Sequence, residues 1–369
     1  MEPFVKTENL SVGYDGNVLI HDISWQLEKG SILTLIGPNG AGKSTILKTI
    51  TNHLKRISGS VFVDKDEISA WTGKALAKKM AVVLTDRIRP ELMTCAEVVA
   101  MGRYPYTNAF GKLTQEDTLI VQNALERVHA RDLADRDFTT LSDGQRQRIM
   151  LARAICQQPE VLILDEPTAY LDIRHKIELL DILRDMAHAQ KITIIMSLHE
   201  IDLAAKISDF LLCVKGDTIA AFGRPDEILQ HKTIEHLYDM EHGSYNLLFG
   251  SVELTKPAGK PEVFVVAGGG FGIPYYRALQ KADIPFATGI LFENDVDYQV
   301  ARELSDHVIA APAFEPMTEQ HYEAAAAVMR NCKTVLNAGT PAGTFNAYNQ
   351  KLLYLAEREQ LPTWNRPAK

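Results

Sequence analysis

The hydrophobic pattern of the first 250 residues predicts an α/β fold. Residues 5–10 and 18–20 alternate between polar and apolar positions about a turn at 13–16, which is typical of antiparallel strands. Mainly apolar runs without this alternation follow at 31–36, 81–84, 161–164 and 192–196. Because parallel strands are covered on both faces, such runs predict the buried strands of a parallel sheet.

Residues 86–137 differ from this pattern. They carry helical patterns at 95–101 and 115–128 and no clear strand pattern. We therefore expect a helical subdomain, at about residues 87–158, inserted into the α/β core.

A second domain is predicted after a linker at residues 255–262, which is rich in Pro, Gly and Lys. The two domains would span residues 1–254 and 263–369. Strand patterns in the second domain lie at 263–266, 286–291, 307–311 and 334–337, and helical patterns lie at 274–281, 319–329 and 350–359. This alternation predicts a small, mainly parallel sheet covered by helices.

Two features of the second domain leave alternatives open. The glycine-rich stretch 267–272 between a strand and a helix suits either an anion or nucleotide site or tight packing without a ligand. The carboxylates of Glu293, Asp295 and Asp297 either hold a metal or form a solvated acidic loop. A regulatory role for this domain is a hypothesis.

Composition narrows the function classes. The chain has 369 residues and a net charge of −8, which argues against nucleic-acid binding through a broad basic surface. No apolar run is long enough to span a bilayer, and the first residues lack a signal-peptide pattern. The four cysteines are far apart and have no metal or disulfide spacing, so we expect reduced thiols.

The strongest chemical signal follows the run at 31–36. It is a glycine-rich loop that enters a helix, with the sequence Gly37-Pro38-Asn39-Gly40-Ala41-Gly42-Lys43-Ser44-Thr45. Glycines let backbone N–H groups surround a phosphate, and the helix N-terminus attracts the same anion. Lys43 can reach the β- and γ-phosphates, and the Ser44 hydroxyl can bind Mg²⁺, so this loop predicts nucleotide binding.

Polar residues end two of the predicted strands. Asp165 and Glu166 follow the run at 161–164, where α/β proteins place their ligands. Asp165 can hold Mg²⁺, and Glu166 can polarise an attacking water. His199 follows the run at 192–196 and either contacts the γ-phosphate or is structural.

Two further segments are candidate nucleotide contacts. Tyr14, in the first predicted turn, either stacks on a base or is half-buried in the sheet. A second candidate anion site lies at a predicted helix start, formed by Ser142, Asp143, Gly144 and Gln145.

These motifs, in this order, resemble the ATP-binding subunit of an ABC transporter over about residues 1–250. The resemblance implies a RecA-like core, an antiparallel β subdomain and a helical insertion. Tyr14 matches the adenine-stacking aromatic, Ser142–Gln145 the signature with Asp143 in place of the usual glycine, and 170–172 the D-loop. It implies ATP and Mg²⁺ as cofactors, and Glu166, His199 and Lys43 as catalytic residues.

One segment departs from the family pattern. Thr85-Asp86 stands where the family usually has Pro-Gln. Asp86 can still face Mg²⁺ as a carboxylate, but it donates no hydrogen bond as the glutamine does.

The segment Met101-Gly102-Arg103-Tyr104-Pro105-Tyr106-Thr107 resembles the G-R-x-P-x segment of importers for iron–siderophores, haem and cobalamin. Import of an iron complex is therefore expected, with cobalamin import or a soluble, non-transport ATPase as alternatives.

The resemblance also implies the partners. Two copies would pair head to tail around ATP, and residues 103–107 would receive a multi-span permease at the cytoplasmic face of the inner or plasma membrane. An external substrate-binding protein would act indirectly, and no nucleic-acid partner is expected.

Overall fold

The computed structural model describes residues 2–84, 90, 92–108, 111–246 and 248–365. The chain divides into two compact units, Met1–Asp239 and Met240–Lys369. Each unit has two sheets and two hydrophobic core clusters of its own among the described residues.

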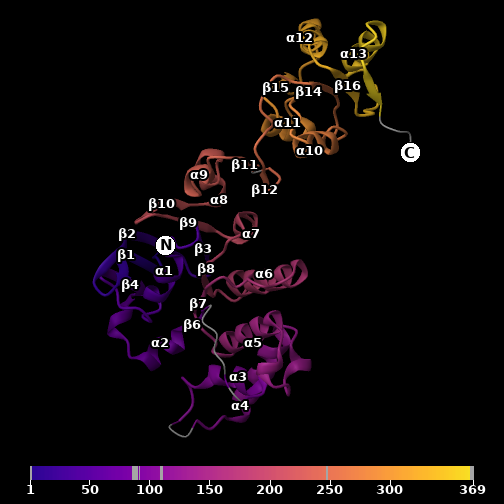
Figure 1. The fold of residues 1–369 in the computed structure, drawn as a ribbon. Coiled ribbons are helices and arrows are strands. Elements are labelled where there is room, and N and C mark those ends of the chain that lie inside the picture. The colour runs from indigo at the N-terminus through magenta and orange to yellow at the C-terminus, as the bar shows by residue number, and fades with distance from the viewer. Residues whose placement is uncertain (1, 85–89, 91, 109–110, 247, 366–369) are drawn as a thin grey trace. The chain divides into compact units, whose positions relative to one another are not determined.

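The N-terminal unit combines two sheets with helices (Figure 1). Its strands are β1 (Val5–Tyr14), β2 (Asn17–Leu27), β3 (Ile32–Ile36), β4 (Ser58–Val63), β5 (Asp66–Glu67), β6 (Met80–Val83), β7 (Val161–Leu164), β8 (Thr193–Ser197), β9 (Phe210–Lys215) and β10 (Thr218–Gly223). Its helices are α1 (Lys43–Ile50), α2 (Gly73–Lys79), α3 (Cys95–Ala100), α4 (Gln115–Arg127), α5 (Asp143–Cys156), α6 (Ile173–His188), α7 (Ile201–Ile207), α8 (Pro225–Ile228) and α9 (His231–Leu237).

The central sheet has the order β10-β9-β3-β8-β7-β6, parallel except for β10. Every residue of β3, β7 and β8 is buried, which confirms the prediction from their apolar runs. Since parallel strands share one carboxyl edge, the segments after β3, β7 and β8 emerge close together.

The predicted antiparallel strands are also confirmed. They form a separate sheet of order β2-β1-β4-β5. Helix α1 contributes Ile46, Leu47 and Ile50 to one core shared with residues of both sheets. This packing fixes the start of α1 relative to β3.

The predicted helical insertion is present. Helices α3 and α4 both pack on α5 (Figure 1), and the described part of residues 86–137 contains no strand longer than the bridge between Thr94 and Asp137. The 3₁₀ turn η2 (Met101–Arg103) follows α3 and also contacts α5.

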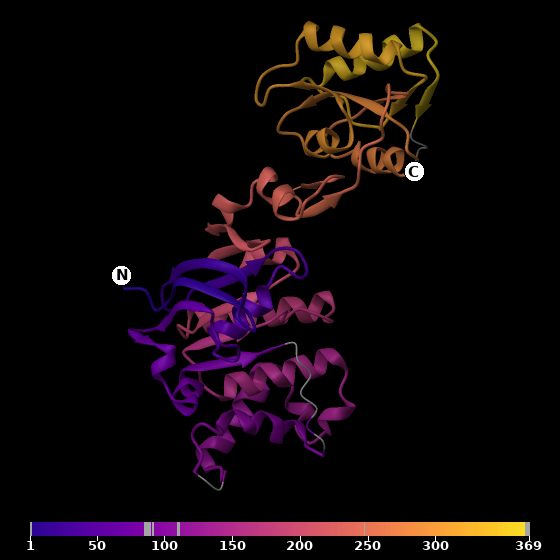
Figure 2. The same ribbon diagram turned by 60° about the vertical axis from the view of Figure 1, so that its left-hand side comes forward.

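The C-terminal unit contains a five-stranded sheet of order β15-β14-β13-β16-β17, parallel throughout. Helices α10 and α11 cover one face and α12 and α13 the other (Figure 2). Its strands are β11 (Ser244–Asn246), β12 (Ser251–Glu253), β13 (Val263–Val266), β14 (Phe286–Phe292), β15 (His307–Ala311), β16 (Thr334–Asn337) and β17 (Thr363–Asn365). Its helices are α10 (Ile273–Lys281), α11 (Val296–Leu304), α12 (Glu319–Arg330) and α13 (Ala347–Arg358).

The boundary between the units lies earlier in the chain than the sequence predicts. The hairpin β11–β12 groups with the C-terminal unit, although the predicted boundary is residue 254. The Arg277 guanidinium donates to both carboxylate oxygens of buried Glu253 at 2.7 and 3.0 Å. The Ser244 hydroxyl donates to Glu303 at 2.7 Å. These side-chain contacts join the hairpin to α10 and α11.

Several N–H groups of the glycine-rich loop after β13 donate to two carboxylates of the same unit. Asp295 accepts from the Gly269 N–H at 2.8 Å, and Asp297 accepts from Gly272 at 3.0 Å and Ile273 at 3.1 Å. Asp297 is fully buried, so it does not belong to a solvated acidic loop. In the described residues no group of three or more His, Cys, Asp or Glu side chains could hold a metal ion. The contacts favour the packing alternative for the glycines.

Candidate active site

A cavity of about 480 Å³ lies at the carboxyl end of β3. It collects residues that are far apart in the sequence. Its lining consists of Tyr14, Leu19, Asn39, Gly40, Gly42, Lys43, Ser44, Thr45, Glu166 and His199. The sequence singled out all of these except Leu19, whose place in β2 gives no chemical signal.

The loop between β3 and α1 requires glycine at particular points. Gly37 has φ +147°, and a Cβ there would lie 2.2 Å from the carbonyl oxygen of Val214. Gly42 has φ +93°, and its Cβ would lie 2.7 Å from Ile20. The Val214 backbone leaves no room for a side chain at Gly37, and the positive φ disfavours one at Gly42, so the loop shape depends on both glycines.

Lys43 begins α1, and its side chain folds back over the loop. Its ammonium donates to the carbonyl oxygens of Gly37 at 2.7 Å and Pro38 at 2.9 Å. Burial lowers the pKa of Lys43, while the nearby carboxylates of Glu166 and Asp165 act in the opposite direction. The loop thus presents a buried ammonium beside the helix N-terminus, where an anion is favoured.

Tyr14 ends β1 and keeps half of its surface exposed. Its hydroxyl lies 3.2 Å from the Thr45 hydroxyl in α1. This hydrogen bond joins the phenol end of the ring to α1, while half of the residue stays exposed.

The ends of β7 and β8 supply the acids and the histidine. Asp165 is buried, and the Ser197 hydroxyl donates to it at 2.6 Å. Glu166 has φ +50° and is partly exposed, and its Oε1 lies 2.6 Å from His199 Nε2. The arrangement puts a carboxylate–imidazole pair opposite the loop that carries Lys43.

The predicted segment 142–145 does not line this cavity. Ser142 is the N-cap of α5, and its hydroxyl accepts from the Gln145 N–H while the Gln145 side chain accepts from the Ser142 N–H. Asp143 forms an ion pair with Arg146 at 3.1 Å. Because α5 packs with α3 and α4, within one chain this segment belongs to the helical insertion (Figure 1).

Other predicted residues lie beside the cavity or outside the described chain. Gly37, Pro38 and Ala41 belong to the loop without lining the cavity, and Asp165 is linked to the lining residue Glu166 through Ser197. Asp86 lies outside the described residues.

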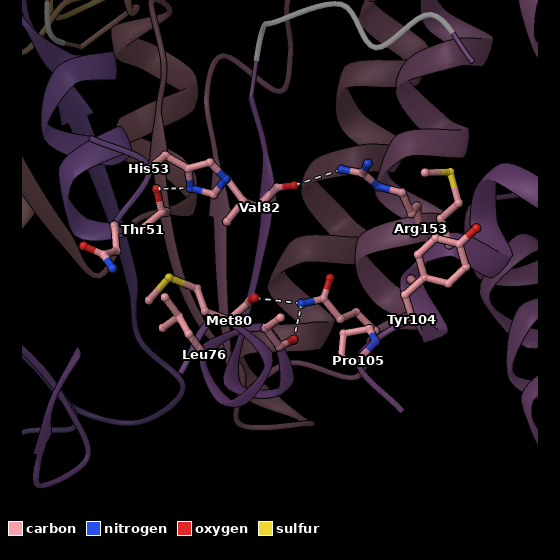
Figure 3. A pocket seen from close by; sticks show the side chains of 14 residues that line it. Thr51, His53, Leu76, Met80, Val82, Tyr104, Pro105 and Arg153 are labelled. Carbon is pink, nitrogen blue, oxygen red and sulfur yellow. Dashed lines mark hydrogen bonds between the residues drawn. The ribbon is translucent and has the colours of Figure 1, made fainter. Parts of the chain in front are cut away.

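A second cavity, of about 490 Å³, lies between the central core and the helical insertion (Figure 3). We call it the insertion groove. Tyr104, Pro105 and Arg153 lie on one side of it, and Leu76 and Met80 on the other. The Arg153 guanidinium donates to the Val82 carbonyl at 3.2 Å, which ties α5 to β6.

A buried ion pair supports the wall of the insertion groove. Arg103 Nε donates to Asp117 Oδ1 at 2.8 Å, with 7% and 9% of the two side chains exposed. Arg103 also donates to the Cys156 carbonyl at 3.0 Å, and its guanidinium lies 4.0 Å from the Tyr106 ring centre. Hydrogen bonds from Thr114, with the Arg103 contact, lower the pKa of Asp117 to about 2.

The loop, the strand-end acids and the buried lysine define a phosphate-loop nucleotide-binding protein. Comparison with known proteins gives the family. Residues 20–169 match the ABC transporter family model, and residues 286–365 match the MJ0874 family.

Several curated relatives match over most of their length. The uncharacterized ABC transporter ATP-binding protein MJ0873 of Methanocaldococcus jannaschii is 45% identical over 75% of this chain and 96% of its own. The cobalamin import ATP-binding protein BtuD of Halobacterium salinarum is 34% identical over 80% and 75%. The petrobactin import ATP-binding protein FpuD of Bacillus anthracis is 35% identical over 70% and 95%.

Among solved structures, an inward-facing ABC transporter of metal-chelate type matches with a TM-score of 0.57 and 29% identity, covering 64% of this chain and 89% of its own. The chain therefore belongs to the ATP-binding proteins of ABC transporters, which bind and hydrolyse ATP to power transport. None of the helices in the described residues is long and apolar enough to cross a membrane.

Proposed function

We propose that this chain is the ATPase subunit of an importer for an iron complex, either a siderophore or haem. The observation that carries the proposal is the convergence of Lys43, Glu166 and His199 on one cavity with Tyr14. The iron cargo is supported by the petrobactin relative and by the metal-chelate transporter structure. Cobalamin is the alternative cargo, favoured by the relative from Halobacterium salinarum.

In this proposal the cavity residues divide the work of hydrolysis. Tyr14 stacks on adenine, and the loop N–H groups with Lys43 hold the phosphates. Glu166 orients and deprotonates the attacking water, and His199, hydrogen-bonded to Glu166, contacts the γ-phosphate. Because these charged groups are already in place before the reaction, little reorganisation is needed to stabilise the transition state, which lowers the barrier to hydrolysis.

The donor set suits Mg²⁺. Ser44 offers a hydroxyl from the start of α1 and Asp165 a buried carboxylate, and Mg²⁺ prefers such hard oxygen ligands. When bound, the ion neutralises charge on the phosphates. Ser44 and Asp165 are the proposed protein ligands, with Asp86 as a further candidate from the sequence.

The segment 142–145 fits a role in a second copy. Within one chain it does not line the cavity that contains Lys43. Its helix start offers N–H groups to an anion, as the loop at α1 does. We therefore propose head-to-tail pairing, in which Ser142, Asp143, Gly144 and Gln145 of one copy cover ATP held by the other.

The insertion groove is the proposed contact for the membrane permease. It combines the exposed Tyr104 and the half-buried Pro105 with the apolar side chains of Leu76 and Met80 (Figure 3). A short amphipathic helix of the permease would bury its apolar face there. The chain would then act as a peripheral subunit at the cytoplasmic face of the membrane.

The predicted C-terminal domain, residues 263–369, is proposed as a regulatory module. It has a separate core and a separate family match. Asp295 and Asp297 already accept from the Gly269 and Gly272 N–H groups of its glycine loop, so we assign no phosphate ligand to that loop.

The first experiment is a pull-down of the tagged chain from detergent-solubilised membranes, with mass spectrometry of the partners. We expect a multi-span protein in near-equal amount. Uptake of labelled iron complexes and of cobalamin, in cells with and without the chain, then identifies the cargo. Recovery of nucleic acid or soluble partners alone would instead favour a non-transport ATPase.

A further inference from the structure

Ser197 links the two acids that follow β7. It is the last residue of β8 and is fully buried. Its hydroxyl donates to Asp165 Oδ1 at 2.6 Å and accepts from the Glu166 backbone N–H at 2.9 Å. One hydroxyl thus contacts both of the acids that are proposed to take part in hydrolysis.

The strand register explains this placement. Strands β7 and β8 are parallel neighbours, with Leu164 paired to Met196. The next residues along, Asp165 and Ser197, therefore emerge side by side at the carboxyl edge. His199 follows two residues later and reaches the Glu166 carboxylate at 2.6 Å. Ser197 and His199 hold Glu166 at its backbone and at its side chain.

A hydroxyl is suited to this double role because it both donates and accepts. Alanine would leave the Glu166 N–H without this acceptor and one Asp165 oxygen without this donor. Glu166 has φ +50°, a conformation that non-glycine residues adopt mainly when neighbouring contacts hold them. The Ser197 contact is one such restraint.

We propose that Ser197 is a positioning residue for ATP hydrolysis. It orients the Asp165 carboxylate toward the metal position and fixes the backbone from which the Glu166 side chain projects. The inference rests on the proposed roles of Asp165 and Glu166. Groups that orient metal ligands typically change metal affinity or activity by about 10- to 100-fold when removed.

The chain offers a matched control in Ser208. Its hydroxyl donates to the Thr34 hydroxyl at 2.6 Å, and Ser208 lies outside the cavity lining. Ser197→Ala and Ser208→Ala each remove one hydroxyl from the same unit. Only the first removal touches the proposed acids.

The test compares both variants with wild type in the full chain. We expect Ser197→Ala to lower kcat by about 10- to 100-fold. Binding of a fluorescent ATP analogue in EDTA should stay within about twofold of wild type, while the gain in affinity on adding Mg²⁺ should shrink by about 10- to 100-fold. Ser208→Ala should keep wild-type kcat and the wild-type response to Mg²⁺.

A folded Ser197→Ala protein with wild-type kcat and wild-type response to Mg²⁺ would overturn the inference. Equal losses in Ser208→Ala would do the same, since they would indicate a general effect of removing a hydroxyl. If Ser197→Ala does not fold, Ser197→Cys replaces the hydroxyl by a slightly larger thiol that donates more weakly, and losses of kcat and of the Mg²⁺ response in the same direction are expected. Wild-type behaviour of that variant would then overturn the inference.

A Glu166→Gln protein in the same assay distinguishes failure of the proposed role of Glu166 from failure of the proposed role of Ser197. If Glu166→Gln hydrolyses ATP normally, the proposed role of Glu166 fails. If Glu166→Gln is inactive and Ser197→Ala is normal, only the role of Ser197 fails.

Discussion

His199 Nε2 lies 2.6 Å from Glu166 Oε1, so the segments after two neighbouring strands form one carboxylate–imidazole pair. Both side chains line the cavity that contains Lys43. The pair gives Glu166 a fixed direction, which a base needs in order to take a proton from one particular water.

Glu166→Gln should remove that base while keeping the shape of the side chain. We expect ATP hydrolysis to fall by about 10²- to 10⁴-fold and ATP binding to persist. A phosphate-release assay and a filter-binding assay measure the two. The matched control is Glu126→Gln, which neutralises an exposed carboxylate of the same unit. Near-normal hydrolysis by Glu166→Gln would contradict the proposed role.

His199→Ala should remove the partner of the Glu166 carboxylate. We expect hydrolysis to drop by at least about tenfold, because general-base catalysis depends on the position of the base. His188→Ala is a suitable control, since His188 pairs with Asp209 on the surface, with half of its side chain exposed. Equal ATPase rates in His199→Ala and wild type would show that the pair is structural.

Gly37→Ala tests the shape of the phosphate loop. The new Cβ would meet the Val214 carbonyl oxygen at 2.2 Å, so the loop or β9 has to shift. We expect loss of ATP binding together with a lower melting temperature. Gly216→Ala is the control, because Gly216 also has positive φ but has open space around its Cβ position. That variant should show only the cost of a Cβ in the left-handed region, about 1–2 kcal/mol. Normal nucleotide affinity in Gly37→Ala would contradict the steric argument.

The sequence predicts those features of this fold that depend on residues close together along the chain. The strands β3, β7 and β8 follow from runs of apolar residues, and the loop before Lys43 follows from its glycines. The sequence did not predict that the β11–β12 hairpin belongs to the C-terminal unit, because this depends on the contact between Glu253 and Arg277 of α10. The sequence named Asp297 but not its role as an acceptor, because its partners, the N–H groups of Gly272 and Ile273, precede it by more than twenty residues.

In the site, too, the sequence predicts features set by local motifs but not those set by contacts between distant residues. Apart from Leu19, the residues that line the cavity could be predicted from motifs at strand ends and from the first turn. Ser197 was visible in the sequence beside His199, but its link to Asp165 depends on the register between β7 and β8.

Arg103→Ala should destabilise the helical insertion. It leaves the Asp117 carboxylate buried without its guanidinium partner, which typically costs about 3–5 kcal/mol for a buried pair. Chemical denaturation measures the free energy of unfolding. The control is Arg127→Ala, whose partner Asp185 is largely exposed. Arg127→Ala should cost no more than about 1 kcal/mol. Similar losses of unfolding free energy in the two variants would show that the buried Arg103–Asp117 pair stabilises the protein no more than an exposed pair.

The pH dependence of Asp117 gives this pair a second test. Its pKa in the folded protein, about 2, lies below the ordinary value of 3.8. The stabilisation from the charged carboxylate is therefore fully present above pH 4 and is lost as the pH falls toward 2. We expect Asp117→Asn to be less stable than wild type at pH 7, with a smaller difference at pH 3. A difference that stays constant over this range would contradict the lowered pKa.

Asp297 in the C-terminal unit should show the opposite pH dependence. Burial raises the pKa of its carboxyl, with hydrogen bonds from Gly272 and Ile273 acting in the other direction. The folded state then holds the Asp297 proton more tightly than the unfolded state. The contribution of Asp297 to the stability therefore decreases as the pH rises from about 4 through the raised pKa. The variant Asp297→Asn carries an amide that cannot ionise.

Hydrogen exchange of the α10 amides in the full chain, corrected for intrinsic rates, measures the local stability. We expect the wild-type protection to decrease over this pH range and that of Asp297→Asn to change less. Asp306→Asn, which alters an exposed carboxylate of the same unit, should keep the wild-type profile. If Asp297→Asn and wild type show parallel pH profiles, Asp297 does not hold a proton in the folded protein.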